Sequence, residues 1–274
     1  MLTPHTETVA THYTRRHAIR GDLFGEQPFA NYGYWTRDGL SMVQAAEALT
    51  RLVAASAGLA RGDRLLDVGC GYGAGAVVFA RAFDVDAITG IDVTPVRIDE
   101  GRRYVAAQGY AERIDLRLGD ATRMEFADGS FDKLVSVECA FHFDTRVDFL
   151  REAARVLRPG GTLALTDLIP RRGVDPTVYQ RGVNAVGSEV CLDNVANTYD
   201  ADVYAAHLRA AGFESVRIES ILESTRIPFV DALQRAGERD SSERGAQMLR
   251  SVARQREILA GGEDYVLVVA RKSG

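Results

Sequence analysis

The chain has 274 residues, 46% of them hydrophobic, which is enough to bury the core of one large domain with or without a cap. Its 33 basic and 38 acidic residues leave a net charge of −5, which argues against a nucleic-acid partner, because such partners usually meet a basic face. The three cysteines, at positions 70, 139 and 191, have no paired spacing, and no signal or membrane-spanning stretch is visible, so we expect a reduced cytoplasmic protein with no metal centre and no membrane partner.

The first 40 residues are rich in aromatic side chains, and we expect them to form a helix followed by a loop. A second helix is predicted over residues 41–58, because Val43, Ala46 and Leu49 recur at helical spacing. A buried strand then leads from residue 65 to a loop with unusual composition.

That loop is glycine-rich, and residues 67–73 read DVGCGYG. Glycine at every second position lets the backbone approach a ligand closely, since side chains there would block it. A second strand over residues 87–92 ends in Asp92, and a carboxylate at that place can accept the hydroxyls of an adenosine ribose. The spacing therefore predicts an adenosine cofactor. A dinucleotide fingerprint would need glycine where the chain has Ala74, and Asp67 suits a cationic cofactor better than a pyrophosphate.

Strands and helices alternate from residue 63 to residue 167, which predicts parallel βαβ units in an α/β fold. Further strands are expected over residues 114–118, 133–138, 162–166, 215–221 and 265–270. The third of these follows a predicted tight turn at residues 157–161, which read LRPGG. A helix over residues 200–211 is expected to end at Gly212. Residues 168–199 and 223–262 break the alternation, and we interpret them as inserts that form a cap over the active site.

These motifs, in this order, resemble those of the class I S-adenosylmethionine-dependent methyltransferases. The resemblance implies a Rossmann-like, doubly wound sheet of seven strands with the last strand antiparallel, and S-adenosylmethionine as the cofactor. The residues that it implies for cofactor binding are Asp67, Gly69, Cys70, Gly71, Gly73, Asp92, Val93, Gly119, Asp120, Ala121, Glu138, Tyr34 and Trp35.

The segment Asn31–Trp35 resembles an N-terminal element of methyltransferases that act on antibiotics, isoprenoids, quinones and sterols. There the segment folds over the cofactor. We therefore expect residues 1–40 to form a lid and residues 41–274 to form the methyltransferase domain. A hydrophobic plug without chemistry is the alternative, and the lid could also pack on a second copy in a homo-oligomer.

Four residues are candidates for a catalytic role. His142 lies just past the fourth predicted strand and titrates near neutral pH, so it could serve as a base, although it could instead orient the cofactor loop. Glu138 ends that strand and could bind substrate, pair with His142 or support the methionine end of the cofactor. Asp167 ends the fifth strand at the same rim, and Tyr13 could reach the site from the lid. Substrate contacts are expected from the aromatic residues Phe141, Phe143, Tyr32 and Phe24.

The expected function is methyl transfer to a hydrophobic small molecule in bacterial specialised metabolism. Aromatic walls favour a carbon acceptor slightly over an oxygen acceptor, because they can shelter a cationic intermediate. Two alternatives stay open at this point. One is a cyclase of the same fold that binds the cofactor without transferring its methyl group, and the other is an NAD-linked oxidoreductase.

Overall fold

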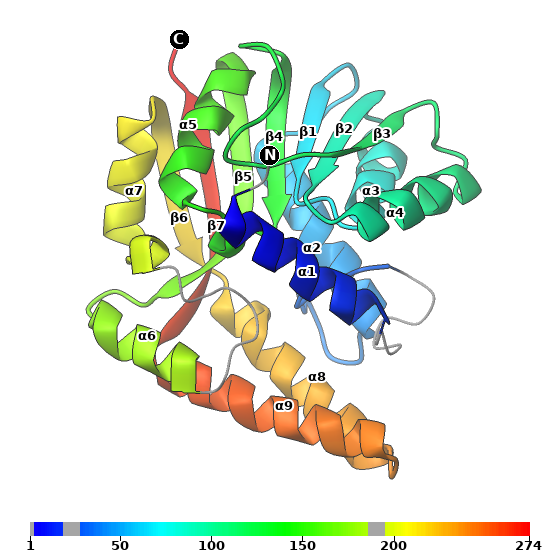
Figure 1. Cartoon of the computed structure of the whole chain (residues 1–274), viewed down its shortest axis with the longest axis vertical. Helices are drawn as coiled ribbons and strands as arrows, with labels where there is room; N and C mark the ends of the chain where they lie inside the picture. The colour runs from blue at the N-terminus through cyan, green and yellow to red at the C-terminus, as the bar shows by residue number, and fades with distance from the viewer. Residues whose placement is uncertain (1–2, 19–27, 186–194) are drawn as a thin grey trace.

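The computed structural model describes residues 3–18, 28–185 and 195–274. Their strands form one sheet in the order β3-β2-β1-β4-β5-β7-β6, in which β7 runs antiparallel to both of its neighbours (Figure 1). The strands are β1 (Arg64–Val68), β2 (Ala87–Asp92), β3 (Ile114–Leu118), β4 (Phe131–Val137), β5 (Leu157–Pro170), β6 (Phe213–Ser220) and β7 (Glu263–Lys272). The predicted seven-stranded sheet with an antiparallel last strand is confirmed.

Helices cover both faces of the sheet. They are α1 (Pro4–Ala18), α2 (Met42–Ala57), α3 (Ala74–Phe83), α4 (Pro95–Ala107), α5 (Arg146–Val156), α6 (Pro176–Ala185), α7 (Ala201–Ala210), α8 (Arg226–Arg239) and α9 (Glu243–Ala260), with short 3₁₀ turns at Ala140–His142, Val195–Asn197 and Leu222–Ser224. One buried cluster joins α5 and α7 to the sheet through Phe149 and Tyr204. A second joins α2, α3 and α4 to the other face through Val53, Phe79 and Val105.

The helix predicted over residues 41–58 corresponds to α2, and its ends have clear local causes. Ser41 accepts a hydrogen bond from the backbone of Gln44, whose side chain in turn accepts one from the Ser41 backbone. Gly58 adopts the left-handed conformation at the other end, with φ of 64°. These two caps fix the length of the helix that packs behind the sheet.

Strand β5 is much longer than the predicted residues 162–166. The LRPGG stretch at 157–161 is part of the strand and not a separate turn, since Phe131 pairs with Leu157 and Lys133 pairs with Thr162. The extra residues on β5 form an irregularity at Gly160, which has φ of 71°. At its other end β5 continues to Pro170 because it pairs with β7 as far as Glu263.

The described parts of the predicted cap inserts contain the helices α6, α8 and α9. Helices α8 and α9 pack against each other through Phe229, Leu233 and Val252, and α6 packs on α9 through Tyr179 and other apolar side chains. In Figure 1 these three helices lie together beyond the end of the sheet at which the parallel strands finish. No helix in the part of the chain that the structure describes is long and apolar enough to cross a membrane.

Helix α1 crosses the same end of the sheet (Figure 1). Its first residues contact the loops that follow the parallel strands: the Thr3 hydroxyl donates to Asp144 at 3.0 Å, and Thr6 donates to Asp120 at 3.3 Å. The N-terminal segment is thereby held over the carboxyl ends of β3 and β4.

Candidate active site

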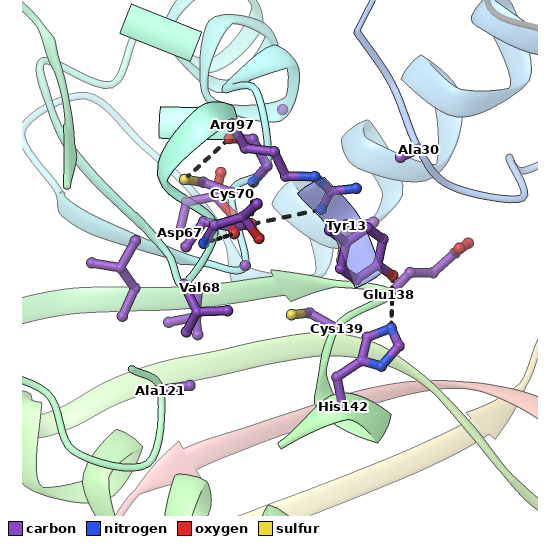
Figure 2. A pocket seen from close by; sticks show the side chains of 18 of the residues that line it. Tyr13, Ala30, Asp67, Val68, Cys70, Arg97, Ala121, Glu138, Cys139 and His142 are labelled. Carbon is purple, nitrogen blue, oxygen red and sulfur yellow. Dashed lines mark hydrogen bonds and ion pairs between the residues drawn. The ribbon is translucent and has the colours of Figure 1, made fainter. Parts of the chain in front are cut away.

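A pocket lies at the carboxyl ends of β1 to β4, beside α1 (Figure 2). Its wall consists of the loops after these strands, of α1, of residues 28–31 and of a few residues from α2, α3 and α4. The sequence-predicted residues that line it are Tyr13, Asp67, Gly69, Cys70, Gly71, Asp92, Val93, Gly119, Asp120, Ala121, Glu138, His142 and Phe143. Those that lie in the described part of the chain but not in this wall are Tyr32, Tyr34, Trp35, Gly73, Phe141 and Asp167. Phe24 lies outside the described residues.

The three glycines of the loop have positive φ angles of 76°, 54° and 76°, but they are needed for different reasons. A Cβ atom at Gly69 would collide with the Cys139 side chain, and one at Gly73 would come within 2.9 Å of Leu116. A Cβ atom at Gly71 would meet nothing nearer than 4.0 Å. Room for a ligand, the reason expected for all three, therefore applies only to Gly71. Gly69 and Gly73 make room for the protein's own side chains.

Two buried carboxyl groups, those of Asp67 and Asp92, flank this loop. Asp92 accepts hydrogen bonds from the backbone N–H of Gly71 at 3.1 Å and of Thr94 at 2.8 Å, which fixes its position. No hydrogen bond from a described residue reaches the Asp67 carboxyl. Burial, together with the charge of Asp92, raises the pKa of Asp67 to about 7. A pocket with an unsatisfied buried carboxyl fits a ligand that brings a cationic group.

Asp120 follows β3 and links the pocket to the lid. One of its oxygens accepts from the backbone N–H and the hydroxyl of Thr122, both at 2.8 Å, and the other accepts from Thr6 on α1. Asp120 thereby connects the loop after β3 with α1.

His142 closes the 3₁₀ turn after β4 and is 5% exposed. Its Nε2 atom lies 2.7 Å from the hydroxyl of Tyr13, whose ring meets the imidazole edge-on (Figure 2). The His5 ring contacts the His142 carbonyl oxygen at 2.9 Å, and the Phe141 ring packs against the imidazole at 4.3 Å between centroids. These contacts fix both the ring and the backbone of His142 at the pocket wall.

Glu138 stands at the end of β4 in the left-handed region, with φ of 53°. Its backbone N–H donates to the Thr166 hydroxyl, and one carboxyl oxygen accepts from the Tyr32 backbone at 2.6 Å and from the Tyr265 hydroxyl at 2.7 Å. Burial outweighs these two hydrogen bonds and raises the pKa of Glu138 to about 8. Glu138 therefore carries a proton at neutral pH and connects the pocket to β7.

Asp167 does not face the pocket, contrary to expectation. It is fully buried on the side of the sheet covered by α5 and α7, where Arg146 pairs with it at 2.7 Å and the Tyr204 hydroxyl donates to it at 3.0 Å. Successive side chains of a strand point to opposite faces, so it is Thr166 that points toward Glu138. Asp167 holds helices on the sheet and has no access to an acceptor.

Most of the predicted aromatic contacts also lie beside the pocket and not in it. Tyr32 packs against Phe229 of α8 and Tyr265 of β7, and Trp35 joins the cluster between α8 and α9. Tyr34 and Phe141 belong to a neighbouring apolar cluster. The segment around Tyr32 thus attaches the cap helices to the sheet.

Among the wall residues that sequence reasoning missed are Thr6, Cys139 and Arg97. Thr6 and Cys139 carry no pattern by which they could be found. Arg97 does have a signal, because it stands in the first turn of the helix that begins directly after the predicted ribose carboxylate, Asp92.

Comparisons with known proteins agree with this geometry. Residues 66–165 match the model of a methyltransferase domain. The erythromycin 3''-O-methyltransferase of Saccharopolyspora erythraea is 30% identical over 91% of this chain and 85% of its own length. The 27-O-demethylrifamycin SV methyltransferase of Amycolatopsis mediterranei is 32% identical over 99% of each chain. The chain belongs to the S-adenosylmethionine-dependent methyltransferases.

Solved structures agree with this fold. The [4+2]-cyclase SpnF superposes with a TM-score of 0.79 at 28% identity, covering 100% of this methyltransferase and 98% of that chain. Geranyl diphosphate C-methyltransferase from Streptomyces coelicolor has the same fold, with a TM-score of 0.76 at 18% identity over 98% of each chain.

The methyltransferase therefore uses S-adenosylmethionine, as predicted. The NAD-linked alternative is set aside. The chemistry of the wall fits this cofactor, since a sulfonium and an ammonium group suit the buried carboxyl of Asp67, and a ribose suits the fixed carboxylate of Asp92.

Proposed function

We propose that this methyltransferase methylates a hydroxyl group on a hydrophobic natural product. The observation that carries the proposal is the 2.7 Å contact between His142 Nε2 and the Tyr13 hydroxyl in the pocket wall. Methylation of a hydroxyl oxygen requires loss of its proton, and an imidazole held at the wall can take it. The names of the two relatives described above, both of which act on oxygen, support this choice over the carbon acceptor that the aromatic segment favoured.

In the proposed reaction the cofactor, when bound, supplies an electrophilic methyl group. His142 Nε2 takes the proton of the acceptor hydroxyl, directly or through the Tyr13 oxygen. Its contacts with His5 and Phe141 keep the ring in place for this step. General-base catalysis of this kind contributes about 10²- to 10⁴-fold in rate.

Three carboxyl groups are proposed to hold the cofactor. Asp67 faces its cationic methionine end, Asp92 accepts its ribose hydroxyls, and Asp120 accepts its adenine amino group. Each of the three lines the pocket and ends or follows a different parallel strand, which spreads them along the edge of the sheet. Glu138, which is protonated at neutral pH, is proposed to support the methionine end by hydrogen bonding and not by charge.

The test is methyl transfer from labelled S-adenosylmethionine to a panel of hydroxylated polyketides and their glycosides. We expect label in a new methoxy group and expect His142→Gln to lower kcat by about 10²- to 10⁴-fold. His207→Gln is the matched control, since His207 lies on α7, away from the pocket, and this variant should keep wild-type activity.

Two outcomes would contradict the proposal. Label attached to carbon would reinstate a carbon acceptor. A rearranged, unlabelled product that forms only with the cofactor bound would indicate a cyclase.

A further inference from the structure

Arg97 occupies a position that the proposed chemistry leaves unused. It stands in the first turn of α4 and its side chain is 12% exposed, although a guanidinium is costly to bury without partners. Its one ion pair is long, with 3.8 Å between Nη1 and Asp92 Oδ2. Its Nε–H has no hydrogen-bond partner among the described residues.

The close contact of Arg97 is with an aromatic ring. Its guanidinium carbon lies 3.7 Å from the centre of the Tyr13 ring, well inside the range of a cation–π contact, and 5.4 Å from the Tyr72 ring. Figure 2 shows the guanidinium against the Tyr13 ring and the Tyr13 hydroxyl pointing to His142. Arg97 therefore touches the tyrosine whose other end holds the imidazole.

These contacts form one continuous line. It runs from Asp92, which is fixed by the glycine loop, to Arg97, then to Tyr13, and ends 2.7 Å further on at His142 Nε2. The line connects the carboxylate proposed for the ribose with the group proposed as the base, and it joins α4, α1 and the turn after β4.

We propose that Arg97 is a positioning residue that holds the Tyr13 ring on the line between Asp92 and His142. The inference rests on the proposed role of His142. Arg97 touches neither His142 nor the acceptor; it sets the orientation of Tyr13, and Tyr13 sets that of the imidazole. Because Asp92 is the other contact of the guanidinium, the placement of the base is tied to the place where the cofactor binds.

The experiment is a double-mutant cycle with Arg97→Met, Tyr13→Phe and the combined variant. Tyr13→Phe keeps the ring and removes only the hydroxyl. We expect Arg97→Met to lower kcat about 10-fold, in the range of a desolvated cation–π contact. Tyr13→Phe should lower kcat by a similar factor, because it removes the hydroxyl that contacts His142 Nε2. The double variant should lose little more than either single variant. Arg97→Lys should recover part of kcat, because an ammonium group also binds an aromatic face.

Arg103→Met is the matched control, since Arg103 lies exposed on the same helix and pairs only with Glu100. It should keep the wild-type kcat. The affinity for S-adenosylhomocysteine, measured by calorimetry, separates loss of catalysis from loss of cofactor binding. The proposal would be overturned if the loss of kcat in the double variant equalled the product of the losses in the two single variants. It would also be overturned if the variants changed only the affinity for S-adenosylhomocysteine.

A readout without turnover keeps this inference separate from the proposed function. In protein with ¹⁵N-labelled histidine, Arg97→Met should shift the His142 Nε2 resonance when Tyr13 is present and leave it unchanged in the Tyr13→Phe background. An equal shift in both backgrounds would contradict the line through Tyr13. If His142→Gln stays active, His142 is not the base. If the Tyr13-dependent shift of the His142 Nε2 resonance is nevertheless seen in the other variants, the positioning role of Arg97 remains.

Discussion

Glu138 shows how burial sets the protonation state of a single residue in this enzyme. Its carboxyl oxygen accepts from Tyr32 and Tyr265, yet its pKa rises from 4.5 to about 8 because desolvation dominates. Between these two pH values the folded protein holds a proton that the unfolded chain has released. The free energy of unfolding must therefore fall as the pH rises through this window.

Glu138→Gln should remove this part of the pH dependence, because an amide accepts the same two hydrogen bonds and has no proton to lose. Relative to wild type, we expect the variant to gain stability as the pH rises from 4.5 toward 8. Urea unfolding of both proteins at several pH values, without cofactor, measures the difference. Asp67, whose pKa is also raised, contributes equally to both proteins and cancels. If the free energies of unfolding of the two proteins changed equally with pH, the assignment of the proton to Glu138 would be wrong.

The residues also show which parts of the site the sequence can predict. The position of Asp92 beside the glycine loop could be predicted, because it follows from local order along the chain, one strand and one loop at a time. The direction of Asp167 was not, because a strand end alone does not say which of two adjacent side chains faces the pocket. Arg97 and Tyr13 lie 84 positions apart in the sequence, and no local pattern predicts their contact.

At the scale of elements, the segment that leads from β1 into α3 contains two kinds of glycine. Gly69 has a positive φ and a Cβ there would collide with Cys139, whereas Gly75 lies in the first turn of α3 with ordinary contacts of 3.7 Å around its Cβ position. Gly69 is therefore required by its backbone conformation and by the nearby Cys139 side chain, whereas Gly75 is not required in this way.

This contrast gives a matched pair of variants. Gly69→Ala should lower the free energy of unfolding by more than about 2 kcal/mol, because the backbone is strained and Cys139 must move. Gly75→Ala should be neutral or stabilise the protein by up to about 1 kcal/mol, since alanine favours a helix. Denaturant unfolding without cofactor tests both. A Gly69→Ala variant as stable as the wild type would show that the loop tolerates a side chain at position 69.

The extent of the elements was predicted less well than their kind and order. The βα alternation and the helix over residues 41–58 rest on local patterns, and both are present. Strand β5 continues past residue 166 to Pro170 because it pairs there with β7, which lies much further along the chain, as in the pair Pro170 and Glu263. Partners so distant leave no trace in the local pattern.

Across the whole molecule, two buried ion pairs attach helices to the sheet. Arg146 of α5 pairs with Asp167 of β5, and Arg226 of α8 pairs with Glu263 of β7, with all four side chains at most 2% exposed. Removing one partner of such a pair leaves the other charged and buried, which costs about 3–5 kcal/mol.

Asp167→Asn should therefore destabilise the enzyme by about 3–5 kcal/mol, because it leaves Arg146 uncompensated, while kcat stays close to wild type well below the melting transition. Asp202→Asn is the control, since its pair with Arg172 is exposed at 67% and 69% and should cost about 0–1 kcal/mol. Thermal unfolding and kcat are measured on the same samples. A loss of kcat without a loss of stability would return Asp167 to the catalytic candidates.

The position of β7 also decides how the last part of the sheet is attached. β6 pairs with no described strand except β7, so it is joined to β5 only through β7. Contacts between such distant segments form slowly in folding. Because Tyr265 of β7 donates to Glu138 in the pocket, local opening of this half would disturb the active site while β1 to β4 stayed paired. Enzymatic activity would then fall during a partial unfolding in which the glycine loop after β1 keeps its structure.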